Sequence, residues 1–356
     1  MTAPVIAIDA MGGDRAPGEI VAGALAAVDA CDVDILLVGR PDAIAPHLPG
    51  GTTPERVDVL AASEVVEMHD DPANAIRTRK DSSLVRCAEA VRDGDAAAMV
   101  GAGNTGATMA AALLKWGRIK GVHRPAIAIP LPIIGTDRKQ LLVDGGATTD
   151  PDAAWLVEWA ELAREYARVR LGVDEPTIAV LSNGEEAGKG DALRKRTSEL
   201  FADVKGFVGN IEGRDLVAPS ADVIITDGFT GNVALKTIEG SLMALAGMVF
   251  GVVDEPGPWS EHANALKLRL LEAAAPLLPD NTGGALLLGV KGVCIISHGS
   301  SSANAIVNAV QLARNCVDAN VVARLTEAVA AGREADRSTL AEGRVAQGAG
   351  GRSDAR

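Results

Sequence analysis

The sequence predicts an α/β protein with a mainly parallel sheet that helices cover on both faces. The first observation is that short apolar runs alternate with longer segments of helical periodicity, as in repeated strand–helix units. The second is that several of these runs are continuous and β-branched, which favours strands buried on both faces. The third is the length of 356 residues, which allows a full core without disulfide support.

The first half of the chain contains four strands in this pattern. A β-branched strand at 5–8 enters the loop AMGGD and a helix at about 17–30, which has proline near its first turn. Runs at 35–38 and 57–60 are predicted as buried strands, separated by the loop HLPGGTTPE. A helix at 84–91 follows. The run AAAMV then passes through GAGNTG into the helix ATMAAALLKW, all within residues 96–116.

The second half repeats the pattern. Strands are expected at 126–129 and 141–143, and the second of them opens into DGGATTD before a helix at about 151–170. The run at 177–181 enters SNGEEAGKG and a helix that contains Leu193 and Leu200. The last two strands, at 223–226 and 293–296, enter DGFTGN and SHGSSSAN, and each is followed by a helix.

We expect one catalytic α/β domain over residues 1–332. Within it, residues from about 242 to 279 are apolar, helical and interrupted by proline, which predicts a helical hairpin. Residues 333–356 contain too few large apolar side chains to repay the entropy of ordering, so this tail is predicted to be disordered.

Most of the predicted strands end in polar or small residues. Parallel sheets bind ligands at the carboxyl ends of their strands. These strand ends are therefore predicted to form the wall of a single cleft, and the six junctions lie at Asp9, Gly101, Asp144, Ser182, Asp227 and Ser297.

The glycines at 101, 103 and 106 have the G-x-G-x-x-G spacing, which lets backbone N–H groups approach an anion. A dinucleotide site also needs an acid about 20 residues further on. The chain has no Asp or Glu between Asp95 and Asp137, and it carries four cations there instead. This favours phosphate or a phosphorylated carrier, and a tight structural turn without a ligand is the alternative.

Composition excludes several classes of function. A net charge of -13 argues against nucleic-acid binding, which needs a dominant basic face. The four cysteines are widely spaced, so we expect buried thiols in a reducing cytoplasm and no zinc site. No segment has a leader pattern or roughly 18 uninterrupted apolar residues, so a cytosolic protein is expected. The histidines show no catalytic or metal signature, and His69 and His298 are open to two interpretations, a hydrogen-bond donor or a structural imidazole.

Two polar side chains suit chemistry on a carbonyl group. Lys189 lies in a glycine-flanked loop before a helix, where an ammonium group can hold an oxyanion. Asn232 offers an uncharged amide donor at another helix start, which suits a carbonyl oxygen that becomes negative. The structural alternatives are a solvated lysine and a helix-capping asparagine.

Taken together, IAIDAMGGD, VGAGNTGA, LLVDGGA, SNGEEAGKG, DGFTGN, GALLLGVKG and ISHGSS resemble the bacterial phosphate acyltransferases of phospholipid synthesis. The resemblance extends from about residue 5 to residue 312. It implies an enzyme that converts long-chain acyl-acyl-carrier-protein and inorganic phosphate to acyl phosphate and free carrier protein, which feeds glycerol-3-phosphate acylation. It also implies a three-layer αβα Rossmann-like sandwich similar to isocitrate and isopropylmalate dehydrogenases and phosphate acetyltransferases. A homodimer with peripheral attachment to the inner face of the cell membrane is implied as well.

By the same resemblance, Lys189 and Asn232 match positions implicated in catalysis, and neither a cofactor nor a metal is expected. The residues expected to bind substrate are Asp9, Gly12, Gly13, Gly103, Asn104, Thr105, Gly106, Asp227, Gly231, His298 and Ser300. Acyl carrier protein is expected to meet two basic runs, which consist of Arg77, Arg79, Lys80, Lys115, Arg118, Lys120 and Arg124.

Two other functions stay open at this point. One is a metal- and nicotinamide-dependent decarboxylating dehydrogenase on the same fold, which would need clustered aspartates, whereas those of this chain are dispersed. The other is a non-enzymatic protein that binds acyl chains at a membrane surface.

Overall fold

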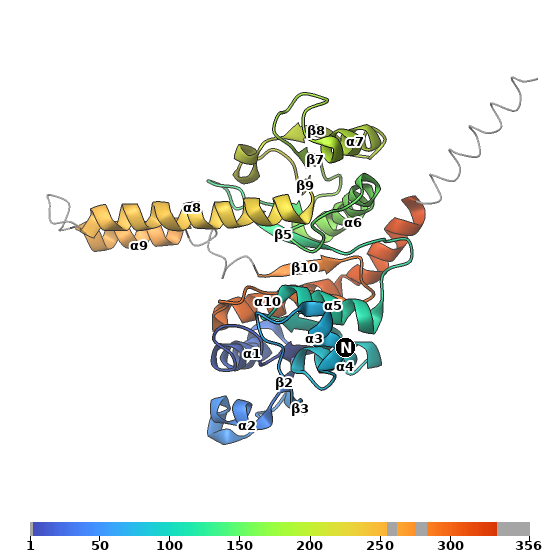
Figure 1. Ribbon diagram of the computed structural model, residues 1–356. Helices are drawn as coiled ribbons and strands as arrows, with labels where there is room; N and C mark the ends of the chain where they lie inside the picture. Colours follow the sequence, from blue (N-terminus) through green and yellow to red (C-terminus); the bar gives the residue numbers. More distant parts are fainter. Residues whose placement is uncertain (1–2, 255–261, 275–282, 333–356) are drawn as a thin grey trace, which may run out of the picture.

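The computed structural model describes residues 3–254, 262–274 and 283–332 (Figure 1). Eleven strands form one sheet in the order β3-β2-β1-β4-β11-β10-β5-β6-β9-β7-β8. The predicted α/β class with a mostly parallel sheet is confirmed. The strands are β1 Val5–Asp9, β2 Asp34–Gly39, β3 Val57–Ala61, β4 Ala98–Gly101, β5 Ala126–Pro132, β6 Lys139–Val143, β7 Ile178–Leu181, β8 Phe207–Ile211, β9 Val223–Ile225, β10 Ala285–Leu288 and β11 Val293–Ile296.

The helices lie between these strands in the predicted alternation. They are α1 Gly18–Cys31, α2 Pro41–Ile44, α3 Pro72–Thr78, α4 Ser83–Asp93, α5 Thr105–Trp116, α6 Ala153–Leu171, α7 Ala192–Phe201, α8 Gly228–Asp254, α9 Ala263–Ala274 and α10 Ala303–Asp318. Residues 321–332 are also helical.

Two of the strands, β8 and β10, were not expected from the sequence. The β8 sequence FVGNI contains Gly209 and Asn210, which are residue types depleted in strands. The β10 sequence ALLL has no β-branched residue, and periodicity cannot assign so short an apolar run. Both become strands because their neighbours in the sheet offer hydrogen-bonding edges.

The sheet consists of two parallel groups that run in opposite directions. Strand β10 is antiparallel to β11 and to β5, and β5 is antiparallel to β6. These three reversals separate β3-β2-β1-β4-β11 from β6-β9-β7-β8. The six polar junctions predicted to form one cleft therefore do not follow strands of one direction: Asp9, Gly101 and Ser297 follow strands of one group, and Asp144, Ser182 and Asp227 follow strands of the other.

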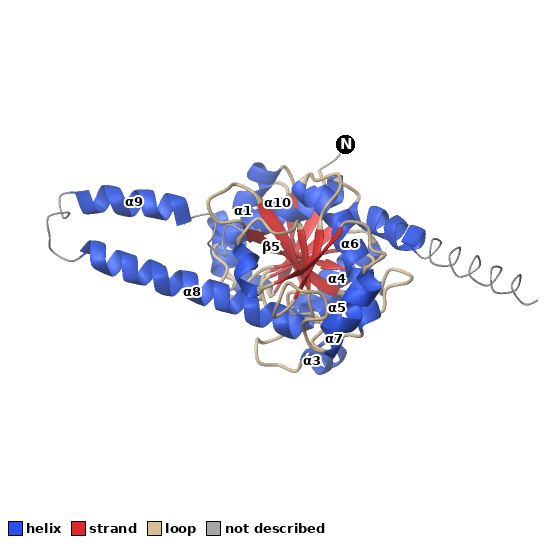
Figure 2. Ribbon diagram, turned by 90° about the horizontal axis from the view of Figure 1, so that it is seen from above, coloured by secondary structure: helices blue, strands red, loops and turns tan. Residues whose placement is uncertain are grey.

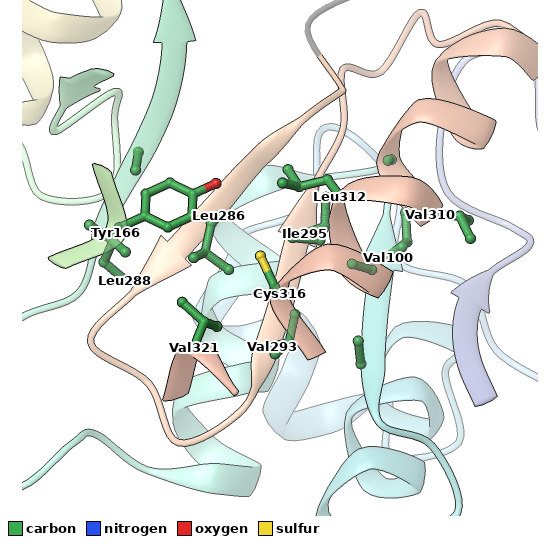
Figure 3. Close-up of a cluster of buried hydrophobic side chains, with 14 of the residues drawn as sticks. Val100, Tyr166, Leu286, Leu288, Val293, Ile295, Val310, Leu312, Cys316 and Val321 are labelled. Carbon is green, nitrogen blue, oxygen red and sulfur yellow. The ribbon is translucent and has the colours of Figure 1, made fainter. Parts of the chain in front are cut away.

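Separate apolar cores lie on the two faces of the sheet, as predicted. One core includes Trp159 and Tyr166 of α6 with residues of α1 and α10, and the other includes residues of α4 and α5. Figure 3 shows part of the first core, where side chains of α6, β10, β11 and α10 meet. The four cysteines are buried and free, as predicted, and burial raises the pKa of Cys294 to about 12.

Helices α8 and α9 form a hairpin that projects from the body of the protein (Figures 1 and 2). They correspond to the predicted hairpin, although its residues 255–261 and 275–282 lie outside the described residues, as does the predicted tail at 333–356. By length and composition alone, α8 is apolar enough to cross a membrane. The criterion of roughly 18 uninterrupted apolar residues did not identify α8, because Lys236 and Glu239 interrupt its sequence.

Candidate active site

The candidate active site is a cavity of about 450 Å³ between α8 and the loops that follow β4, β6 and β11. It therefore draws on both parallel groups of the sheet. Its polar and glycine lining residues are Asp14, Gly103, Thr105, Gly145, Gly146, Asn232, Lys236, Glu239, Gly284, Ser297, His298 and Gly299. Its apolar lining residues are Met68, Ile127, Ile129, Pro130, Leu131, Pro132, Leu235, Ile238, Leu242, Ala285 and Ile296.

The loops after β1 and β4 pack backbone against backbone. A Cβ atom on Gly12 would lie 3.0 Å from the Gly103 nitrogen, and a Cβ on Gly103 would lie 3.1 Å from the Gly12 Cα. Gly13 has a φ of +114° and approaches the carbonyls of Ala102 and Gly299 equally closely. These glycines bring the loop ends together, but of the three only Gly103 lines the cavity.

Asp9 and Asn104 hold these loops in place. Buried Asp9 accepts a hydrogen bond from the Met11 N–H at 3.1 Å, and burial raises the pKa of its carboxyl. Asn104 caps α5 by accepting from the Ala107 N–H at 3.0 Å, and its amide donates to the carbonyls of Glu67, Met68 and Asp70. Neither side chain lines the cavity, so we revise both expectations from substrate contact to loop positioning.

Asp144 organises the loop after β6 in a similar way. Its Oδ1 accepts from the N–H groups of Ile127, Gly146 and Ala147 at 2.8–3.0 Å, and its Oδ2 accepts from Thr148 at 2.7 Å. Burial raises the pKa of this carboxyl, although the four donors oppose the shift. The loop that Asp144 fixes presents Gly145 and Gly146 to the cavity.

The glycines of DGFTGN let α8 begin directly against that loop. A Cβ on Gly231 would lie 1.9 Å from the Asp144 carbonyl oxygen, and one on Gly228 would lie 2.6 Å from its carboxylate. This contact brings Asn232 beside Gly146, where a Cβ would be 3.5 Å from the Asn232 Cβ. Asn232 is exposed in the cavity and has no hydrogen bond to another described residue. Gly231 thus positions Asn232 but does not itself line the cavity.

The first turn of α8 is fixed from its other side by Arg194 and Asp227, which are both buried. Arg194 of α7 pairs with Asp227 and donates to the hydroxyls of Thr226 and Thr230 at 3.0 and 2.8 Å. Burial raises the pKa of Asp227, but the hydrogen bond from the Thr230 N–H and the Arg194 charge outweigh it, and the net shift is downward. Asp227 was predicted to bind substrate, whereas no role was predicted for Arg194. The structure makes the pair an anchor for α8.

Lys189 lies outside the cavity. Its loop follows β7, which is the neighbour of β9 in the sheet, so the loop lies close to the start of α8 in the topology. The side chain is exposed and crosses Gly184, where a Cβ would lie 2.8 Å from the Lys189 Cγ. The two expected catalytic residues therefore do not share the cavity wall.

Lys236 was not predicted from the sequence. It lines the cavity one helical turn after Asn232. Its Nζ is 2.9 Å from His298 Nε2 and 2.7 Å from Glu239 Oε2. An ammonium group can only donate, whereas His298 Nδ1 lies 2.8 Å from the Ser300 hydroxyl and accepts from the Ser300 N–H at 3.2 Å. Lys236 keeps a third N–H for a ligand. The spacing of four residues from Asn232 was the signal that could have revealed it.

The charged groups of the lining do not favour an anion by themselves. Among the described lining residues, one lysine faces two carboxylates, Asp14 and Glu239. Within the described part of the chain, no three His, Cys, Asp or Glu side chains cluster as a metal site.

The two predicted basic runs are only partly free. Arg79 pairs with Asp70 at 2.6 Å and Lys115 pairs with Glu89 at 2.8 Å, whereas Arg77 and Lys80 are exposed on and just after α3. The other three cations, Arg118, Lys120 and Arg124, surround a separate hollow of about 550 Å³ that Leu113 and Leu114 also line. This hollow lies at the C-terminal end of α5, and the active-site cavity lies at the N-terminal end.

Comparison with known proteins gives consistent results. Residues 5–324 match the family model described as "Fatty acid synthesis protein". A phosphate acyltransferase of Desulfitobacterium hafniense (strain Y51) is 45% identical over 323 residues, covering 89% of this chain and 95% of that protein. The phosphate acyltransferase of Bacillus subtilis (strain 168) is 42% identical over 327 residues, covering 91% and 97%.

Two solved structures share the fold at low sequence identity. A phosphotransacetylase from Streptococcus pyogenes has a TM-score of 0.58 at 15% identity and covers 88% of this chain and 94% of its own. A branched-chain phosphotransacylase from Enterococcus faecalis V583 has a TM-score of 0.56 at 15% identity and covers 88% and 99%. At this identity the likeness extends to the fold alone.

Proposed function

The chain belongs to the family of the bacterial phosphate acyltransferases, and from this premise we propose that it transfers a long-chain acyl group from acyl carrier protein to inorganic phosphate. A phosphate oxygen attacks the thioester carbonyl carbon, a tetrahedral oxyanion forms, and the carbon–sulfur bond breaks. The proton of hydrogen phosphate ends on the released thiol. The products are acyl phosphate, which supplies glycerol-3-phosphate acylation, and free carrier protein.

The observation that carries this proposal is a single cavity with a polar end and a long apolar wall. Asn232, Lys236 and the glycine loops at 103 and 145–146 lie at the polar end. In this proposal the Asn232 amide stabilises the oxyanion. Phosphate is substantially dianionic near neutral pH, so it needs positioning and charge neutralisation more than a strong base.

Two lysines share that neutralisation in our proposal. Lys236 supplies its remaining N–H to phosphate inside the cavity. One lysine facing two carboxylates is insufficient for a dianion, so the exposed ammonium of Lys189 provides the second charge from the adjacent loop. Backbone N–H groups near Gly103 and Thr105, at the start of α5, add neutral donors.

The rival functions are weaker but testable. We retain the expected likeness to the isocitrate and isopropylmalate dehydrogenase fold as part of this proposal. That likeness is the reason to consider a decarboxylating dehydrogenase as a rival function. The relatives named phosphate acyltransferase favour acyl transfer instead. An acyl-binding scaffold would share the cavity but would release no thiol.

One experiment separates the three. The protein is incubated with hexadecanoyl-acyl-carrier-protein, with and without phosphate, and acyl phosphate is trapped with hydroxylamine. Phosphate-dependent thiol release together with hydroxamate formation supports the proposal. Turnover that requires a divalent metal and nicotinamide would indicate the dehydrogenase, and binding without thiol release would indicate the scaffold.

We propose that acidic acyl carrier protein docks on the basic hollow around Arg118, Lys120 and Arg124. Helix α5 has 12 residues, so its two ends are about 18 Å apart. The thioester arm of the carrier would bridge this distance. Reversing Arg118 and Lys120 together to Glu should raise the apparent KM for the carrier and flatten its salt dependence, because rim charges mainly steer association.

The matched control is the double reversal of Arg196 and Lys205, which are exposed and lie on and just after α7. It changes the net charge equally, so it should leave the carrier KM near the wild-type value. Equal effects of the two double variants would show that overall charge, and not this hollow, governs carrier binding.

We also propose that the α8–α9 hairpin serves a homodimer and a peripheral contact with lipid on the cytoplasmic face of the membrane. The supporting observation is a set of exposed apolar side chains, namely Met243, Leu245, Met248, Val252, Leu266, Leu268 and Leu271. Exposed apolar patches of this kind mark contact surfaces. Met248→Glu and Leu268→Glu should weaken binding to anionic liposomes or dimerisation measured by light scattering. If neither measurement changes, this role is wrong.

A further inference from the structure

We propose that the apolar part of the cavity is the acyl-chain site, and that the chain lies between α8 and β5 with its carbonyl carbon at Asn232 and its far end at Leu242. This inference rests on the proposed function and adds the path of the substrate. Two observations support it: β5 and α8 extend along the cavity from the same point, and the β5 wall offers few hydrogen-bonding groups.

Both walls start at the same polar point. The Gly145 N–H donates to the Ile127 carbonyl at 2.9 Å, and Gly146 lies against Asn232, so the start of β5 and the start of α8 meet at this loop. From there, residues 127 and 129–132 of β5 line the cavity. Residues 232, 235, 236, 238, 239 and 242 of α8 also line it, and this spacing corresponds to one helix face.

The length of this face suits a long chain. Ten residues separate Asn232 from Leu242, which corresponds to about 15 Å along the helix axis. Beyond Leu242 the same helix continues into the projecting hairpin (Figures 1 and 2), so we place the far end of the acyl site where α8 leaves the body of the protein. A substrate that leaves through this end does not have to pass Asn232.

The β5 wall offers an alkyl chain almost no hydrogen-bonding group. Strand β10 pairs with Ala126, Ile127 and Ala128 of β5, and no described strand pairs with the edge beyond them on that side. Pro130 and Pro132 occupy this open edge and have no N–H. Sugars and nucleotides require donors and acceptors along such a wall, whereas a hydrocarbon does not.

The α8 wall is apolar only in part, because three of its lining residues are polar or charged. Leu235, Ile238 and Leu242 line the cavity and supply its apolar surface on this helix. Lys236 forms an ion pair with Glu239, and its ammonium group contacts the His298 ring. A total volume of about 450 Å³ lies within the range of small-molecule sites. The cavity thus combines a polar end with a hydrocarbon end.

The test uses stable product analogues and needs no turnover. Binding of dodecyl phosphate and hexyl phosphate, both below their aggregation concentrations, is measured by calorimetry. Wild-type protein should bind the dodecyl compound at least about tenfold more tightly, because each buried methylene adds several-fold to affinity. Leu242→Trp fills the far end and should remove most of this preference, with hexyl phosphate affinity unchanged.

Ser241→Trp is the matched control, because Ser241 directly precedes Leu242 on α8, is exposed and does not line the cavity. It should keep the wild-type preference. Ile238→Ala is the second variant in case Leu242→Trp does not fold, and it should weaken dodecyl binding more than hexyl binding. Equal affinity of the wild type for both chain lengths, or equal effects of the two tryptophan variants, overturns the proposal.

The outcomes also separate this inference from the proposed reaction. A protein that prefers the dodecyl compound but forms no acyl hydroxamate has the groove without the activity. A protein that forms acyl hydroxamate but shows no chain-length preference in binding has the activity and holds its substrate elsewhere.

Discussion

Asn232→Ala is expected to lower kcat for phosphate-dependent thiol release by roughly two to three orders of magnitude, the loss typical of one missing oxyanion donor. Its amide lies exposed in the cavity, beside Gly146, without a hydrogen bond to another described residue. That donor is therefore available to substrate at no cost to the fold. The KM for phosphate should change little, because the interaction strengthens in the transition state.

Asn315→Ala is the control for this result, since Asn315 is an exposed asparagine on α10 that does not line the cavity. It should retain wild-type turnover. Thermal unfolding of both variants shows whether they are folded. Near-normal kcat in a folded Asn232→Ala variant would remove this residue from the mechanism and leave its amide with a purely structural role.

Arg194→Met is expected to reduce the free energy of unfolding by about 3–5 kcal/mol, the typical cost of leaving one member of a buried ion pair without its partner. Only 8% of Arg194 and 4% of Asp227 is exposed. The substitution also removes the donors to Thr226 and Thr230 and so loosens the first turn of α8. Urea titration followed by circular dichroism measures the change.

Arg196→Met on the same helix is the matched control. The Arg196–Glu199 pair is exposed, and such pairs contribute about 0–1 kcal/mol, so the stability of this variant should stay close to that of the wild type. A loss in Arg194→Met no larger than in the control would mean that the Arg194–Asp227 pair does not anchor α8.

Much of the fold was predictable from local sequence. Nine strands were predicted close to their observed positions, because buried β-branched runs and the glycine or proline residues that border them are local signals. The capping residues of α4 and α5, Ser82 and Asn104, are likewise local. The motif GAGNTG was correctly placed between a strand and a helix for the same reason.

The composition of the cavity was not predictable in the same way. Pairing direction depends on which strands become neighbours, and the pairing of β10 with β5 joins Leu286 to Ala128, which are far apart in the sequence. Lys236 is a candidate phosphate-binding residue because it lines the cavity beside His298, which follows it by 62 positions in the sequence. Asp9 and Asn104 have side chains typical of ligand contacts, but nearby backbone donors and acceptors engage them in the folded chain.

The sequence by itself determined the α/β class, most strands and helices, the buried thiols and the family. Periodicity, turn residues and motif spacing act over a few residues, so they can be read without the fold. Only the tertiary structure decided that Asn232 and Lys236 share one cavity while Lys189 lies outside it, and that Arg194 anchors Asp227. Those relations depend on strand order, on glycine contacts between loops and on burial, which arise when distant segments pack together.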